Sequence, residues 1–261
     1  MLQGLKRQWQ ARGSRGVVAA LQHKLRPKSL RLALCRAKVA GKNGLEIGGP
    51  SPIFSDKGQL PLYQCVGTLD CLNFASQTLW EGQLVHGAPF ISPEGRPLGR
   101  QLVGDMTRIA SVADHAYDFV LSSHVIEHTA NPLAALDELR RILMPGGPVI
   151  MITPHYRDTF DRRRPVSTLE HLMRDYEGHT TEADLSHREE SLALHDFSWD
   201  LDSLSRERMA ELSADNEKHR VLHHHVFDED LVHRMLHAAG FTTLVVERAH
   251  PCHIIAIAQA P

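Results

Sequence analysis

The chain has 261 residues, 42% of them hydrophobic, and a formal net charge of −2 at pH 7. This length supports one sizeable core, so we expect a single main domain with additions. The four cysteines form no CxxC pair, no secretory signal precedes the first elements, and no apolar run approaches membrane-spanning length. We therefore expect a soluble, cytoplasmic protein with reduced thiols and no transmembrane segment.

The charge is unevenly distributed along the chain. Residues 1–43 hold eleven Lys or Arg and no Asp or Glu, which leaves 18 basic against 31 acidic residues in the remainder. Apolar side chains at helical spacing predict that residues 1–40 form a basic helical arm. Three roles are open for this arm: a helical lid packed over the donor site of the acidic body, which we favour, a peripheral contact with an anionic surface, or a docking element for nucleic acid or a phosphate-bearing carrier.

Residues 41–261 read as the main domain, with insertions at about 73–100 and 155–225. In chain order, the pattern predicts strands at 44–47, 63–69, 101–103, 117–121 and 149–152, helices at 132–143 and 228–239, and two last strands at 242–247 and 254–258. Asn131 and Pro132 are typical of a helix start. The last two strands are too close for a parallel crossover, so they must form a hairpin.

This alternation predicts an α/β fold, a doubly wound, Rossmann-like and mostly parallel sheet with a terminal antiparallel strand, plus N-terminal helices. Its first strand ends in Glu46, Ile47, Gly48 and Gly49. Glycines at the carboxyl end of a strand allow a nucleotide-like ligand to approach the backbone. Asp70, 24 positions after Glu46, has the spacing of a carboxylate that binds ribose hydroxyls.

The order of motifs resembles the class I S-adenosylmethionine-dependent methyltransferases, of the small methyltransferase-domain type found in bacteria. The resemblance covers residues 44–152 and, more loosely, 226–258, and it is strongest in the sequence from Tyr117 to Pro148 (YDFVLSSHVIEH, then NP, LRRIL and PGG). The glycine block departs from the family pattern, because Pro50 and Pro52 stand where further glycines are usual. Prolines offer no N–H donors for a pyrophosphate, which favours S-adenosylmethionine over a dinucleotide.

The resemblance implies a set of cofactor-binding residues at four successive strand ends. Glu46 would accept from the donor's ammonium, Asp105 would hold the adenine amino group, and Met106 would lie against the ring. The full set consists of Glu46, Gly48, Gly49, Asp70, Asp105, Met106, Ser122 and His124. Asp70 and Asp105 can each also be interpreted as turn residues.

Methyl transfer to a hydroxyl or amine also needs a base. We assign the catalytic role to His155, just beyond the fifth strand, and to Asp161. The alternative is that Asp161 pairs with the arginines beside it and that His155 is an ordinary loop residue. Among the 18 histidines, His233 and His237 lie one helical turn apart, but no metal-binding signature accompanies them, so we assign no metal ligand.

The sequence therefore predicts an S-adenosylmethionine-dependent methyltransferase that acts on a small or carrier-linked acceptor. By analogy with domains that accompany glycan synthesis, we rank a sugar hydroxyl of a surface glycan first. The alternatives are an RNA or protein methyltransferase that docks through the basic arm, and a non-catalytic module that binds the donor.

Overall fold

The computed structural model describes residues 31–200 and 204–261. Most of the expected basic arm lies outside these residues, and its described part is helix α2 (Leu32–Val39). No helix in the described part of the chain is long and apolar enough to cross a bilayer.

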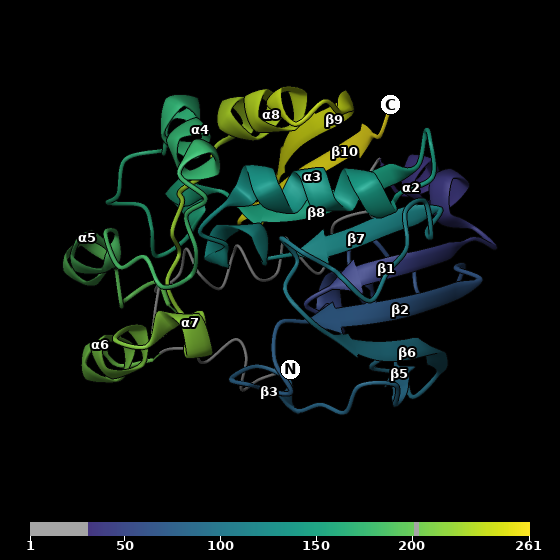
Figure 1. Cartoon of the computed structure of the whole chain (residues 1–261), viewed down its shortest axis with the longest axis horizontal. Coiled ribbons are helices and arrows are strands. Elements are labelled where there is room, and N and C mark those ends of the chain that lie inside the picture. The colour runs from purple at the N-terminus through teal and green to yellow at the C-terminus, as the bar shows by residue number, and fades with distance from the viewer. Residues whose placement is uncertain (1–30, 201–203) are drawn as a thin grey trace.

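A central sheet of eight strands organises the molecule (Figure 1). In spatial order its strands are β5 (Pro89–Ile91), β6 (Pro97–Val103), β2 (Thr68–Asn73), β1 (Asn43–Ile47), β7 (Phe119–Ser123), β8 (Pro148–Pro154), β10 (His253–Gln259) and β9 (Thr242–Ala249). The five strands from β6 to β8 run parallel, whereas β10 is antiparallel to both neighbours and β5 is antiparallel to β6. The predicted fold class, including the antiparallel last strand of the chain, is confirmed.

Helices cover both faces of the sheet and its carboxyl edge. Helices α3 (Pro132–Ile142) and α8 (Glu229–Ala238) pack on one face, and α2 packs on the other. The segment between β8 and α8 supplies α4 (Leu169–Glu177), α5 (Arg188–Leu194), α6 (Arg206–Ser213) and α7 (Asn216–His219). Figure 1 shows these four helices beyond the carboxyl ends of the parallel strands. A small hairpin pairs β3 (Gln77–Thr78) with β4 (Gly82–Gln83).

The two faces of the sheet carry separate hydrophobic clusters, and β7 contributes to both. Val120 belongs to the cluster under α3 and α8, whereas Phe119 and Leu121 belong to the cluster under α2. Successive strand residues point to opposite faces, so a continuous apolar run is what a strand covered on both sides requires. This is why the sequence of β7 identified it as a buried strand.

The connection from β1 to β2 contains a short 3-10 helix, Pro52–Phe54, where a parallel crossover usually has an α-helix. Buried side chains of this connection, Ile53, Phe54, Leu60, Leu62 and Tyr63, fill the face of the sheet instead. The predicted second strand at 63–69 was therefore wrong, because Tyr63 is in a turn and the strand begins at Thr68.

The remaining predicted elements agree with the structure apart from their ends. The Asn131 side chain accepts a hydrogen bond from the Ala134 N–H at 3.0 Å, as expected of the cap of α3. Strands β9 and β10 form the predicted hairpin. The third parallel strand starts at Pro97, earlier than predicted, and β5 pairs with it from within the segment read as an insertion.

Candidate functional site

A cavity of about 920 Å³ lies at the carboxyl ends of the parallel strands. Strand ends β1, β2, β6 and β7 contribute Ile47, Asn73, Gly104 and Ser123 to its wall. The opposite wall comes from residues within 158–160, 195–200, 204–209 and 220–223, which belong to the segment between β8 and α8. Ligands in open α/β sheets bind at this edge, where the chain leaves the strands to opposite sides.

The glycine turn after β1 forms one side of the cavity. Gly48 has φ +71°, and a Cβ there would lie 2.5 Å from Cγ2 of Val125. A Cβ on Gly49 would lie 2.4 Å from Cδ of Glu46. Both positions therefore require glycine, because a side chain at Gly48 would clash with Val125 and a side chain at Gly49 would clash with the Glu46 carboxylate.

Glu46 lies beneath this turn. Its carboxylate is fully buried and accepts hydrogen bonds from the Ser51 N–H at 3.0 Å and the Tyr63 hydroxyl at 2.9 Å. Burial raises the pKa of Glu46 to about 7, although these donors oppose the shift. We expected Glu46 to face the ligand, but the structure places it behind the cavity wall, where it holds the turn in shape.

Asp70 lies in the first half of β2 and not at its end. Its carboxylate accepts from the Arg100 N–H and the Tyr117 hydroxyl, each at 2.8 Å, and it is not part of the cavity wall. The residue at the carboxyl end of β2 is Asn73, which lines the cavity and donates to the Gly49 carbonyl at 3.3 Å. The predicted position of Asp70 was wrong because the second strand had been placed five residues too early.

Asp105 and Met106 both follow β6, but only Met106 is part of the cavity wall. Met106 lines the cavity, and its sulfur accepts from the Thr129 hydroxyl at 3.3 Å. The Asp105 carboxylate pairs with Arg220, whose guanidinium also lies 4.8 Å from the Phe74 ring centroid. Burial raises the pKa of Asp105, but Arg220 and Thr107 lower it below its usual value overall.

The segment after β7 supplies several groups to the cavity. The predicted Ser122 is buried with its hydroxyl away from any hydrogen-bond partner among the described residues, and its neighbours Ser123 and His124 line the cavity. Glu127 also lines it and is fully buried, yet neither carboxylate oxygen has a hydrogen-bond partner in the described chain. Burial raises the pKa of Glu127, but the histidines around it, His124 first, lower it overall.

The two predicted catalytic residues, His155 and Asp161, have different partners and do not form one site. His155 is buried outside the cavity wall, with Nε2 3.0 Å from a Glu229 carboxylate oxygen. Asp161 pairs with Arg164, the arrangement that our alternative interpretation described, and its other oxygen lies 2.5 Å from Nδ1 of His223. His223 lines the cavity, so Asp161 reaches the site through this histidine.

His223 and Asp161 shift each other's pKa in the directions expected for a protonated imidazole paired with a carboxylate. Burial lowers the pKa of His223, but the Asp161 carboxylate raises it above its usual value overall. Burial likewise raises the pKa of Asp161, and His223 and Arg164 together lower it to about 2. A histidine oriented by a buried carboxylate is suited to take a proton from a ligand in the cavity.

Sequence reasoning left several cavity residues without a role, namely Asn73, Phe74, Glu127, His128, Arg220 and Cys252. Glu127 and His128 lie within the motif that carried the family resemblance, so their place in that motif could have indicated that they line the site. Asn73 ends the apolar run Cys71–Leu72, which marks the true strand end. Arg220 and Cys252 come from distant segments, and no local pattern indicates where they fold.

The strand order and a cavity at the carboxyl edge define a Rossmann-like α/β fold with a ligand-binding site. A family model described as "Methyltransferase domain" matches residues 18–246. The chain therefore belongs to this methyltransferase family, within the class I, S-adenosylmethionine-dependent methyltransferases that the sequence resembled.

The chain is also similar to solved structures. An S-adenosylmethionine-dependent methyltransferase from Mesorhizobium loti is 13% identical, with 87% of this chain and 95% of that chain covered and a TM-score of 0.50. One from Aquifex aeolicus is 13% identical, with 93% of each chain covered and a TM-score of 0.48. The 1,6-didemethyltoxoflavin-N1-methyltransferase of Burkholderia thailandensis, solved with bound 1,6-didemethyltoxoflavin and S-adenosylhomocysteine, is 10% identical, with 99% of this chain and 88% of that chain covered and a TM-score of 0.47. No curated protein matches the chain.

Proposed function

We propose that the cavity binds S-adenosylmethionine over the ends of β1, β2, β6 and β7 and that its methyl group goes to a small or carrier-linked acceptor, with a sugar hydroxyl ranked first. The observation that carries this proposal is the shared cavity, which joins the glycine turn and the strand ends on one side to His223 and aromatic side chains on the other. Bound S-adenosylmethionine supplies a sulfonium methyl group that an acceptor's lone pair can displace.

The charge of the cavity wall fits a cationic donor. Among the described residues that line it, Glu81, Glu127, Asp158 and Asp200 are acidic, and Arg220 is the basic residue apart from histidines. Arg220 is paired with Asp105, so its charge is already compensated. This wall suits a sulfonium and an ammonium better than a pyrophosphate, in agreement with the prolines in the glycine turn.

The positions of residues in the cavity wall indicate which of them would hold the donor. Gly48 and Ser51 would leave backbone exposed to the amino-acid end, Asn73 would take the ribose position predicted for Asp70, and Met106 would face the adenine ring. Glu46 and Gly49 would act indirectly, by fixing the turn. Asp105 would act beside the adenine site through its pair with Arg220.

The acceptor side is formed by His223 and by the rings of Trp80, Phe160 and Trp199. Nε2 of His223 would take the acceptor's proton while Asp161 holds Nδ1 and stabilises the resulting charge. Flat apolar rings beside a base suit a ring-shaped acceptor that carries a hydroxyl. A cavity of about 920 Å³ is near the upper end of small-molecule sites, which leaves room for an acceptor beside the donor.

Two measurements test this function. Calorimetry should detect S-adenosylmethionine binding to the full chain, and binding should weaken in Asn73→Ala but not in Asp70→Asn. Incubation with donor labelled in the methyl group, together with separated fractions of small molecules, glycans, RNA and protein, should then place the label in the small-molecule or glycan fraction. Label in RNA or protein would instead support docking through the basic arm, and binding without any turnover would support a non-catalytic module.

A further inference from the structure

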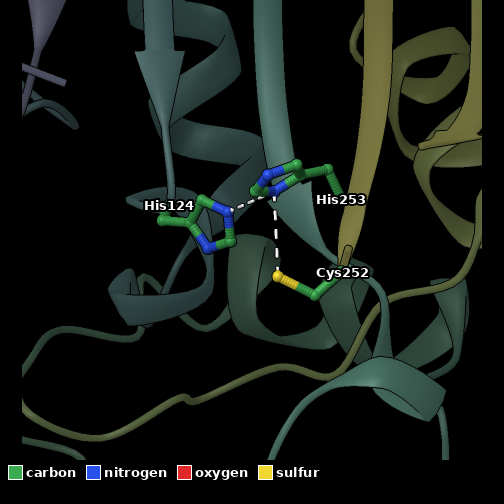
Figure 2. Close-up of side chains that lie close together, drawn as sticks. All are labelled: His124, Cys252 and His253. Atoms are coloured by element: carbon green, nitrogen blue, oxygen red, sulfur yellow. Dashed lines mark hydrogen bonds between the residues drawn. The ribbon is translucent and has the colours of Figure 1, made fainter. Parts of the chain in front are cut away.

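Three side chains of types that can ligate a metal, His124, Cys252 and His253, lie close together, and the first two line the cavity. Nε2 of His124 lies 2.9 Å from Nδ1 of His253, and Sγ of Cys252 lies 3.9 Å from the same nitrogen. All three donor atoms lie within 4.8 Å of one another. Figure 2 shows the two rings and the sulfur turned toward one another, from the end of β7 and the start of β10.

We propose that these three side chains form a zinc site that opens into the cavity. Two imidazole nitrogens and one thiolate are a ligand set that zinc prefers, and three protein ligands with one open position are typical of catalytic zinc. Around a tetrahedral zinc, two nitrogens lie about 3.3 Å apart and a nitrogen and a sulfur about 3.6 Å apart. The two observed separations differ from these values by less than about 0.5 Å, so small side-chain rotations would complete the site.

Backbone hydrogen bonds and strand pairing fix the positions of the three ligands. His124 has φ +56°, an unfavourable conformation for a non-glycine residue, and its N–H donates to the Ile152 carbonyl at 2.8 Å. The Cys252 carbonyl accepts from the His155 N–H at 2.7 Å. His253 is paired in register with Pro154 across β8 and β10. The rigid ends of the sheet, and not a loose loop, therefore position the three donors.

A carboxylate stands behind the first ligand, as in many zinc sites. An oxygen of Glu127 lies 3.5 Å from Nδ1 of His124, on the side of the ring opposite the cluster. Ligating histidines usually present their second nitrogen to such a group, which fixes the tautomer. With its proton on Nδ1, toward Glu127, His124 would present Nε2 to a metal ion in the cluster, and the buried Glu127 would gain a partner.

The cluster opens into the cavity, since His124 and Cys252 both line its wall. The zinc binding does not depend on methyl transfer, but its use does rest on the proposed function. A zinc ion there would bind an acceptor oxygen or sulfur at its open position and lower the pKa of that group. His223 would then receive the proton that the acceptor releases.

The described part of the chain holds two other groups of donor atoms, His171 with His187 and His225, and Glu127 with His128 and His223. Neither contains a cysteine. The first lies outside the cavity wall and serves as a matched control, and in the second His223 already pairs with Asp161. The pair His233 and His237 considered from the sequence is exposed on α8 and belongs to none of these groups.

Elemental analysis of the full chain after dialysis against limiting zinc tests the site. We expect about one zinc per chain in the wild type and in His171→Ala, and less than a tenth of that in Cys252→Ser and His253→Ala. Replacement by cobalt should give a near-ultraviolet thiolate-to-cobalt charge-transfer absorption that Cys252→Ser abolishes and His171→Ala keeps. Circular dichroism and S-adenosylmethionine calorimetry on the same variants establish that they are folded and report separately on the donor site.

The proposal is overturned by a chain that retains no zinc or cobalt, by cobalt bound without the thiolate absorption, or by metal that His171→Ala loses and Cys252→Ser keeps. Each of these results stands whether or not the chain binds S-adenosylmethionine. A failure of the zinc site is thus distinguishable from a failure of the proposed function.

Discussion

The hydroxyl oxygen of Tyr63 lies 2.9 Å from both carboxylate oxygens of Glu46. Tyr63 belongs to the connection that replaces a crossover helix, and Glu46 belongs to the first strand, so this contact joins the two sides of the glycine turn. The Ser51 N–H lies 2.6 Å from the Tyr63 oxygen and 3.0 Å from Oε1 of Glu46. A buried carboxylate thereby sets the shape of the turn that faces the cavity.

We predict that Glu46 makes the stability of the fold depend on pH between about 4.5 and 7. Its folded pKa of about 7 is above the ordinary value of 4.5, so its contribution is complete below pH 4.5 and is lost as the pH rises through 7. The loss is roughly 3 kcal/mol, at 1.36 kcal/mol per pKa unit. Glu46→Gln should lack it, and urea unfolding of both proteins at pH 5 and pH 8 measures the difference. Equal pH dependence in the two proteins would contradict this assignment.

We predict that His223 and Asp161 govern the pH profile of methyl transfer. The base must be neutral, so the rate should rise with pH through the raised pKa of His223. Asp161→Asn removes the carboxylate that raises this pKa, so its rise should move to lower pH while the maximal rate falls at least about 10-fold. His223→Ala should cost about 100-fold or more. Single-turnover rates across pH measure this, and unchanged donor affinity is the control. An unshifted profile in Asp161→Asn would exclude the pair as the base.

We predict that Asn73, and not Asp70, contributes to donor affinity. Asn73→Ala should weaken S-adenosylmethionine binding about 5- to 10-fold, the effect of one lost hydrogen bond. Asp70→Asn should leave affinity unchanged, because the Asp70 carboxylate is engaged by Tyr117 and Arg100 away from the cavity. Calorimetry on both variants decides the matter, and the opposite ranking would restore the assignment made from sequence spacing.

We predict that Arg220 stabilises the packing of the segment before α8 against the residues that follow β6. It pairs with Asp105, lies 3.7 Å from a Glu182 oxygen and covers the Phe74 ring. Arg220→Ala leaves these carboxylates without their cation, so it should destabilise the fold by about 2 kcal/mol or more. A double-mutant cycle with Asp105→Asn, followed by urea unfolding, should show a coupling energy. Strictly additive losses would mean that the pair contributes nothing.

Much of the fold could be predicted from the sequence because its signals are local. The apolar run of β7, the Asn131 cap and the short spacing of the last two strands each identified an element that the structure contains. The second strand was misplaced because residues 63–69 were read as its apolar run, so that Asp70, which lies within the strand, was taken for the residue at its end. Its partner Tyr117 is 47 residues away, so nothing near Asp70 signals this position.

The sequence by itself determined the fold class of the protein, because glycine, proline and alternating apolar residues restrict the backbone locally and place strand ends at one edge of a sheet. Tertiary structure alone decided which polar groups face the cavity. His223 meets Asp161, Arg220 meets Asp105, and Cys252 meets His124 across more than sixty residues of chain in each case. Burial then sets their charges, since the pKa of a carboxylate or an imidazole follows from its neighbours in space and not from its position in the chain.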